Sequence, residues 1–463
     1  MSTLFKLATS LPYSDDADDF TSLSSVAAAY LASESFQESM LSEENLTLLF
    51  GAYFHAHTGF QVSELDDPDA QTALKQCRSA LLTALSDVSA NDAFPTRHPL
   101  GSPASETLFA WLRGPVTSLV PAACIVMGNL SRSDEASTAL VHTHAAHIPL
   151  MKLLSDPSTS DPQTLHSALS FLKNLAIPAA NKPVLGDLLE PACVPRICSL
   201  DTLPQVQFSA ISLLRLLLVN CPANVRLVCS RLSIDESSPS YDKSSVHGII
   251  SLFERTDAEP TKLEAARSIA AICRVLHSNP ATETLPEWDS KKSDELGEDG
   301  GRRDEFYSRH SLSAPLAFLV SQQKWPILRS EAWFVFALMC RSKDGGGVVL
   351  NLMFDVDATA ALIKAVTGRD TVPTTENPNS QLEPNSSATV SMLPEASGIQ
   401  LEPQQVDPKQ LESMARIDRE NAVVLCTEML RHWGNEMPQL RASMWQDLVK
   451  EGTESIVKNR NQQ

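Results

Sequence analysis

The chain has 463 residues, of which 43% are hydrophobic and 6% aromatic, and its formal net charge is −19 at pH 7. The hydrophobic fraction is enough for a folded core, while the few aromatic residues and the 17 glycines argue against an all-β fold. The acidic excess argues against nucleic acid or an anionic membrane as the main partner and favours a basic partner.

The first seventy residues hold twelve acidic side chains and one basic side chain, Lys6. We expect residues 1–70 to form an acidic N-terminal segment that is a partly helical cap. Asp66, Asp67 and Asp69 form one of its acidic clusters, which could attract a partner rich in lysine and arginine. The alternative is a solvated face that keeps the chain soluble.

Residues 71–370 repeat one pattern, in which an alanine or leucine is followed by apolar residues three, four and seven positions later. This is the buried stripe of a helix. The stripes, including one beyond residue 409, begin at Leu81, Ala123, Ala168, Ala210, Ala266, Ala332 and Ala422. The first offsets of 42, 45 and 42 residues match armadillo and HEAT repeats. The pattern predicts an all-α, armadillo/HEAT-type right-handed solenoid whose stacked repeats share one core.

The later offsets are longer because each contains a polar stretch. We expect flexible insertions near residues 233–245 and 280–310. Residues 371–409 are predicted to be a disordered acidic insertion rich in proline and serine, since residues 371–408 contain no lysine or arginine and show no helical period. Residues 410–463 should form a C-terminal helical repeat and cap.

The cysteines and the N-terminus predict the compartment. Nine cysteines lie in mostly apolar runs without a CxxC pair, as buried free thiols do in a reducing compartment. The N-terminus lacks the apolar core of a signal peptide, and no run of about 18 apolar residues occurs. We expect a cytoplasmic monomer with no membrane insertion and no cofactor.

Residues Leu172–Leu218 carry a more specific signal. They contain NLAIP at Asn174–Pro178, then Asn181 and Lys182, and a PxVQF entry to the next helix at Pro204–Phe208. Together with GNLSRSD at Gly128–Asp134 and SEAWFVFALM at Ser330–Met339, they resemble a divergent member of the armadillo-repeat small-GTPase GDP-dissociation stimulator family, usually called SmgGDS. The resemblance covers roughly residues 120–225, and the long insertions depart from the family pattern.

The resemblance implies an activity. Such proteins bind small GTPases of the Rho and Ras type that carry a basic and often prenylated C-terminal tail. They promote GDP release and chaperone the GTPases during prenylation and membrane delivery. Exchange would follow from preferential binding of a nucleotide-poor conformation, so the resemblance implies no catalytic residue in this chain.

Several residues are candidates for partner binding. In the repeat alignment, the residue before the last apolar position should face the concave groove, and Asn129 and Asn174 there could bind a partner backbone or tie down their own repeats. At the same position, three residues could seat a prenyl chain or pack between helices: Leu216, Ile272 and Leu338. Two arginines could meet acidic side chains of a GTPase or form internal pairs: Arg215 and Arg274. The family-like motif adds Asn181 and Gln207.

Other functions have weaker support. Of His142, His144 and His147, only the last two could share a helical face, and no third metal ligand is evident beside them. Gly345–Gly347 lacks the context of a phosphate loop, so we expect no metal site and no catalytic residue. A nuclear import receptor would pair tryptophan and asparagine four residues apart, and none of the six tryptophans here has that partner. A generic armadillo scaffold, or a cargo or chaperone adaptor without exchange activity, fits the solenoid equally well.

Overall fold

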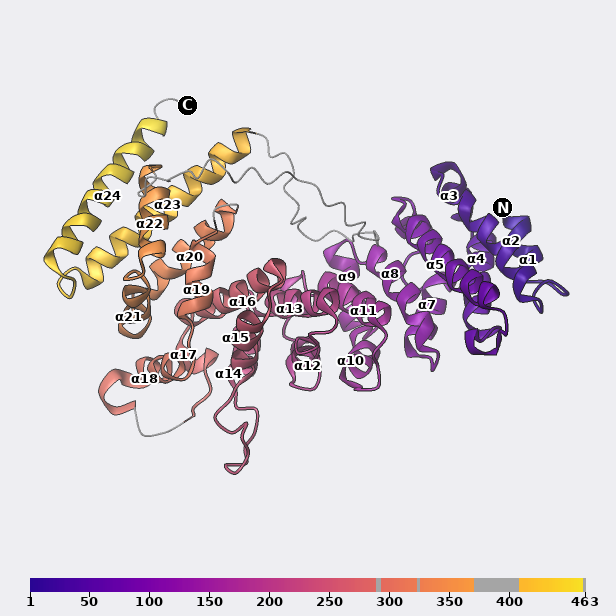
Figure 1. The fold of residues 1–463 in the computed structure, drawn as a ribbon, viewed down its shortest axis with the longest axis horizontal. Coiled ribbons are helices and arrows are strands. Elements are labelled where there is room, and N and C mark those ends of the chain that lie inside the picture. Colours follow the sequence, from indigo (N-terminus) through magenta and orange to yellow (C-terminus); the bar gives the residue numbers. More distant parts are fainter. Residues whose placement is uncertain (289–292, 323–324, 370–407, 461–463) are drawn as a thin grey trace. The chain divides into compact units, whose positions relative to one another are not determined.

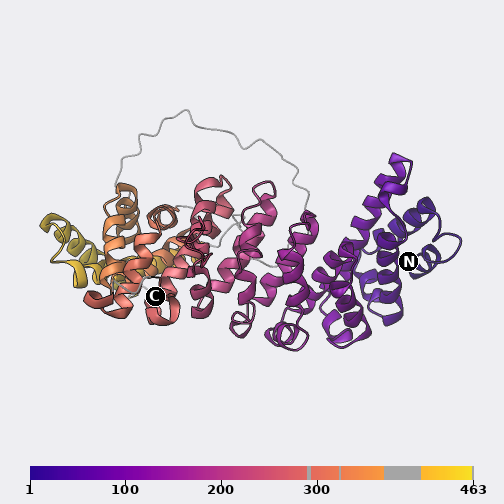
Figure 2. The same cartoon turned by 90° about the horizontal axis from the view of Figure 1, so that it is seen from below.

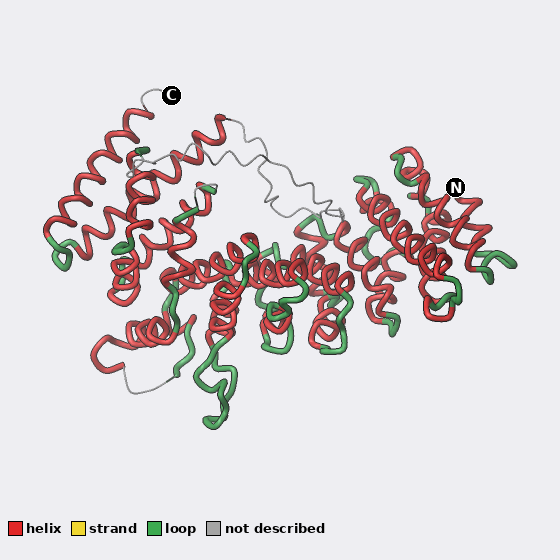
Figure 3. Tube along the Cα trace, viewed as in Figure 1, coloured by secondary structure: helices red, strands yellow, loops and turns green. Residues whose placement is uncertain are grey.

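The structure, a computed structural model, describes residues 1–288, 293–322, 325–369 and 408–460. About 74% of the chain is helical, and no strand occurs among these residues (Figure 3). All seven predicted stripes lie in helices, and all of their residues are buried. The prediction of an all-α chain with helices packed in a repeat-like order is therefore confirmed.

The described residues divide into two compact units, the first of which is Met1–Leu188. Its helices are α1 (Ser2–Ala8), α2 (Ala17–Tyr30), α3 (Glu34–Met40), α4 (Glu43–Thr58), α5 (Pro68–Ala90), α6 (Phe94–Arg97), α7 (Pro103–Arg113), α8 (Val120–Leu130), α9 (Asp134–His142), α10 (His147–Ser155) and α11 (Pro162–Leu175). The striped helices α5, α8 and α11 pack one on the next.

The acidic first seventy residues form part of this unit. Helices α2 and α4 pack on α5, with Phe20 and Leu49 fully buried. Some acidic side chains cap the N-termini of helices. The carboxylate of Asp16 accepts a hydrogen bond from the backbone N–H of Asp19 at 2.9 Å, and that of Asp67 accepts one from the N–H of Asp69 at 3.0 Å. Part of the negative charge therefore caps helix N-termini, where anions are favoured.

The second unit begins at Leu189. Its helices are α12 (Val194–Ile197), α13 (Pro204–Leu218), α14 (Pro222–Cys229), α15 (Ser245–Arg255), α16 (Glu259–Ser278), α17 (Ala281–Thr284), α18 (Ser293–Arg309), α19 (Ser313–Val320), α20 (Pro326–Met339), α21 (Lys343–Leu352), α22 (Val356–Thr367), α23 (Pro408–Trp433) and α24 (Gln439–Arg460). The striped helices α13, α16, α20 and α23 again pack in sequence order (Figures 1 and 2).

The insertions expected from the sequence differ from one another. Residues 233–244 of the insertion predicted at 233–245 belong to a loop between α14 and α15, closed at its base by an isolated bridge between Arg231 and Ser244. Residues 280–310 instead contain α17 and α18, and α18 packs on α21. The carboxylate of Asp344 holds Arg303 of α18 at 2.9 Å, so tertiary contacts stabilise a helix whose sequence is very polar. The insertion predicted at 371–409 lies almost entirely outside the described residues.

The glycine run of α21 serves helix packing. A Cβ atom added at Gly345 would overlap the imidazole of His277, and one added at Gly346 would overlap the indole of Trp433. The two glycines therefore allow α21 to approach α16 and α23 closely, which accounts for the sequence KDGGG without a phosphate site.

All nine cysteine side chains are buried, as their apolar sequence neighbours predict, and none is disulfide-bonded. Within the described ranges, no single helix is both long and apolar enough to cross a membrane, although the bent pair of α21 and α22 meets that criterion by length and composition.

Candidate partner-binding face

The two asparagines at the predicted groove position contact neighbouring repeats of the first unit. The amide of Asn129 on α8 donates to the hydroxyl of Ser89 on α5 at 2.8 Å. The amide of Asn174 on α11 donates to the carbonyl of Gly128 on α8 at 3.3 Å. Both side chains are half-buried. These are the contacts expected of residues that tie down their own repeats, so the geometry favours that alternative.

The two residues added by the family-like motif have internal partners as well. Asn181 is fully buried, and its amide donates to the carbonyls of Leu175 at 2.8 Å and Ser137 at 3.2 Å. Gln207 is buried, and its amide donates to the carbonyl of Cys198 at 3.0 Å and to the carboxylate of Asp201 at 2.7 Å. Because both residues are buried and their amide N–H groups donate inside the fold, neither belongs to the candidate binding face.

A ladder of ion pairs crosses three striped helices of the second unit. Arg215 on α13 contacts Glu264 on α16 at 2.5 Å, and Glu264 also contacts Arg267 at 2.9 Å. Arg267 in turn approaches Glu331 on α20 at 3.6 Å. Glu264 is only 4% exposed, so two guanidinium groups share one buried carboxylate. The ladder fixes these residues on one continuous side of α13, α16 and α20.

The same side of α20 exposes apolar groups. Phe334 is 36% exposed, and Leu338, four residues later, is half-buried. Glu331, Phe334 and Leu338 are spaced by three and four residues, which places them on one helical face. The guanidinium of Arg274 on α16 lies 5.2 Å from the centre of the Phe334 ring, a cation–π contact that joins the two helices.

Helix α23 extends this surface. Val424 is 42% exposed, and Glu428, four residues later, contacts the half-exposed Arg341 that follows α20, at 3.2 Å. We call the combined surface the α13–α23 face; it comprises Arg215, Leu216, Arg267, Arg274, Glu331, Phe334, Leu338, Arg341, Val424 and Glu428. It is apolar at its centre and carries four arginines against three glutamates counting the buried Glu264.

The predicted prenyl seat does not assemble as one site. Leu216 and Leu338 are half-buried on this face, whereas Ile272 is fully buried between helices. The exposed side of α16 is formed instead by Arg267 and Arg274, seven residues apart. The sequence rule therefore selected one position per helix but missed Phe334 and Arg341, which helical spacing from Leu338 could have indicated.

The acidic cluster of the first unit is accessible. Asp66, Asp67 and Asp69 are all exposed at the N-terminus of α5, where Asp67 is the cap residue. They are available for attraction of a basic group, although one of them also serves its own helix.

The three histidines considered for a metal site differ in burial, because His142 is exposed, His144 is half-buried and His147 is buried. His147 is buried, and burial lowers its pKa. His144 stacks on the Phe109 ring with the ring centres 4.7 Å apart. In the part of the chain that the structure describes, no three His, Cys, Asp or Glu side chains are placed to hold a metal ion.

Comparisons with known proteins add little. No protein-family model matches the chain, and no curated protein matches it. Among solved structures, an engineered protein from the Northeast Structural Genomics Consortium is similar, with a TM-score of 0.49 and 15% sequence identity over 98% of each chain. This distant likeness leaves the repeat type and the family as proposals.

Proposed function

We propose that this chain is a right-handed armadillo/HEAT-type protein of the cytoplasm that binds small GTPases of the Rho or Ras type. It promotes GDP release, chaperones their basic and prenylated tails, or does both. The observation that supports binding is the α13–α23 face, where Phe334, Leu338 and Val424 present apolar surface beside arginines. Aromatic and arginine side chains together are enriched in the energetic centres of protein interfaces.

The GTPase as partner rests on the sequence resemblance around residues 172–218. The face adds a chemical requirement, since Arg274 makes no ion pair among the described residues and Arg341 is half-exposed. A partner that places a carboxylate near these arginines and an apolar side chain on Phe334 would satisfy both features. GDP release would then follow from tighter binding of the nucleotide-poor GTPase.

The direct test is release of a fluorescent GDP analogue from purified Rho-type and Ras-type GTPases. We expect the chain to accelerate release, and Phe334→Ala to weaken GTPase binding about tenfold or more, because truncation of a central aromatic residue typically costs at least about 1–2 kcal/mol. Phe354→Ala is a matched control: Phe354 is 52% exposed and also lies under an arginine, Arg441, but outside the face.

The outcomes separate the proposal from its alternative. If no GTPase binds at low salt and none releases GDP faster, the chain is better described as a generic scaffold or a cargo adaptor. If GTPases bind but Phe334→Ala and Phe354→Ala behave alike, the partner uses another surface.

A further inference from the structure

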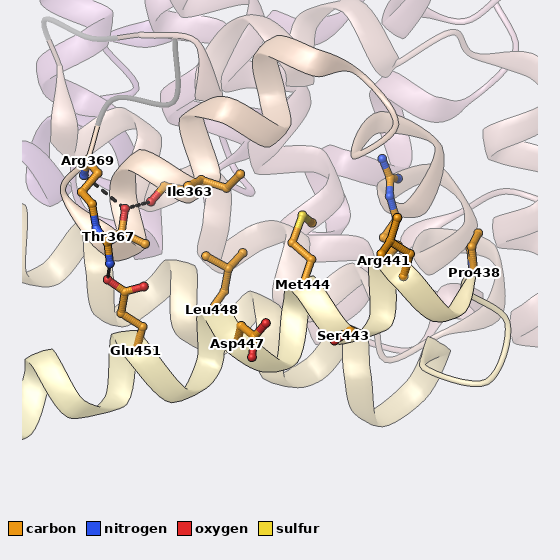
Figure 4. A pocket seen from close by; sticks show the side chains of 11 residues that line it. Ile363, Thr367, Arg369, Pro438, Arg441, Ser443, Met444, Asp447, Leu448 and Glu451 are labelled. Carbon is orange, nitrogen blue, oxygen red and sulfur yellow. Dashed lines mark hydrogen bonds and ion pairs between the residues drawn. The ribbon is translucent and has the colours of Figure 1, made fainter. Parts of the chain in front are cut away.

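The last helices of the second unit leave a groove uncovered. Helices α22 and α24 line an open groove of about 790 Å³ (Figure 4). Its lining residues are Ile363, Thr367, Arg369, Pro438, Leu440, Arg441, Ser443, Met444, Asp447, Leu448 and Glu451. All of them belong to α22, α24 or the residues directly beside these helices. In a helical array each repeat is covered by its neighbours, and no other described helix contributes a residue to the lining of this groove.

The floor of the groove is apolar. Leu440 is 87% exposed, Met444 and Ile363 are half-buried, and Leu448 is buried below them. Leu440, Met444, Asp447 and Glu451 are spaced by four, three and four residues, which is the spacing of the contact seam in paired helices. At one end of the groove, Arg369 and Glu451 form an ion pair across it. The surface is thus shaped and patterned to receive another helix.

Two charges on α24 stand without opposite partners. The guanidinium of Arg441 lies 4.1 Å from the centre of the Phe354 ring, and its Nη1 is buried with no hydrogen-bond partner. Asp447 is exposed. Neither residue makes an ion pair within the described ranges. Arg441 and Asp447 lie three residues before and three residues after Met444 (Figure 4).

This spacing makes the surface self-complementary. When two copies of α24 cross in antiparallel directions with Met444 facing Met444, Arg441 of each copy faces Asp447 of the other. The same symmetry places the exposed Leu440 opposite Leu448. A parallel pairing would instead place like charges together. A two-fold interface requires residue i to meet residue j while j meets i, and this arrangement satisfies that condition.

We propose that the groove between α22 and α24 binds a second copy of this chain, with the two α24 helices antiparallel about Met444. Each copy then covers the other's apolar floor and supplies the ion partner for Arg441 and Asp447. The two α22–α24 pairs form a four-helix contact. The monomer expected from the sequence would be one half of this dimer, and the inference does not depend on GTPase binding.

The experiment is a mass measurement by light scattering on the eluting full-length chain over a concentration series. We expect a dimer of about twice the 50.4 kDa chain mass at the highest concentrations. Asp447→Arg alone and Arg441→Asp alone should each shift the sample to monomer. The double variant Arg441→Asp with Asp447→Arg should restore the dimer, because each charge again faces its opposite.

A control variant and three outcomes decide whether the proposed dimer forms. Gln446→Arg introduces the same side chain as Asp447→Arg on an exposed part of α24 that does not line the groove, and it should leave the dimer intact. Thermal melting of every variant checks that α24 still folds. A wild-type chain that stays monomeric at about 100 μM, or a dimer that ignores Asp447→Arg, overturns the proposal, as does a folded double variant that fails to dimerise.

Discussion

A buried ion pair between α20 and α23 gives the sharpest test of the packing in the second unit. Its two residues lie on either side of the longest insertion in the sequence. Arg329 on α20 contacts Asp418 on α23 at 2.9 Å, although 88 residues separate them in the sequence. The side chains of Arg329 and Asp418 are 10% and 2% exposed. Burial raises the pKa of Asp418 above its ordinary value even though Arg329 opposes that rise. Desolvation of the carboxylate therefore outweighs its attraction to the arginine.

This balance predicts different results for single and double variants. Asp418→Asn should destabilise the second unit by about 3–5 kcal/mol, because it leaves the guanidinium of Arg329 buried without a counter-charge. The double variant Arg329→Met with Asp418→Leu should be about as stable as the wild type or more stable, since it removes both desolvation costs. Glu428→Gln is the control: its partners Arg341 and His432 are both exposed, so the loss of these contacts should cost less than about 1 kcal/mol.

Urea unfolding followed by tryptophan fluorescence measures these effects, because five of the six tryptophans belong to the second unit. The coupling free energy between the two positions comes from the four-variant cycle. An Asp418→Asn variant that loses less than about 1 kcal/mol would refute the buried contact between α20 and α23. A double variant as unstable as the single one would refute the argument that desolvation dominates.

Two further changes test the packing elsewhere. Burial lowers the pKa of His277 to about 3 and that of His57 and His310 to about 4. These histidines therefore stay neutral in the folded chain, whereas in the unfolded chain they become protonated near pH 6.5. The free energy of unfolding should therefore fall as the pH drops from 6.5 towards 4, by about 1.4 kcal/mol per pH unit for each histidine. Urea unfolding midpoints that agree at pH 7 and pH 5 would contradict this expectation. Gly346→Ala should lower the free energy of unfolding by about 1–3 kcal/mol, because its Cβ would overlap the Trp433 ring. Gly347→Ala places its Cβ where nothing lies within 4 Å, so it should be neutral or stabilising by up to about 1 kcal/mol. Melting temperatures compare the two, and equal shifts would show that α21 is not tightly packed.

The sequence predicts the striped helices well because their signal is local. Each stripe repeats with the helical period, and each lies buried in a helix. Helix α18 escapes prediction because its sequence is strongly polar, and its support comes from Asp344, forty-one residues after Arg303. The ladder from Arg215 to Glu331 likewise joins residues 49 and 64 positions apart, so no local pattern indicates which carboxylate each arginine meets.

The candidate site is harder to predict from the sequence, because residues at the same position of the repeat pattern differ in burial from one repeat to the next. Asn129 and Ile272 occupy equivalent places in the repeat pattern, yet one is half-buried against a neighbouring helix and the other lies wholly in the core. Small rotations of successive helices change which residue faces solvent while leaving the apolar stripe intact. The exposed residues of the candidate face therefore follow from packing between repeats, which a rule based on a single repeat does not encode.

The charges of this chain would act on a partner of the proposed kind at two distances. The net charge of −19, with its exposed share near Asp66, attracts basic groups at long range, and salt screens that attraction beyond about 8 Å under physiological conditions. At contact distance the α13–α23 face presents Arg274, which makes no ion pair among the described residues and calls for a carboxylate, and Arg341, whose exposed side chain also contacts Glu428. A partner that suits both must carry a basic region that is drawn in and a separate acidic and apolar patch that docks. Raised salt should therefore slow association with such a partner much more than it speeds dissociation.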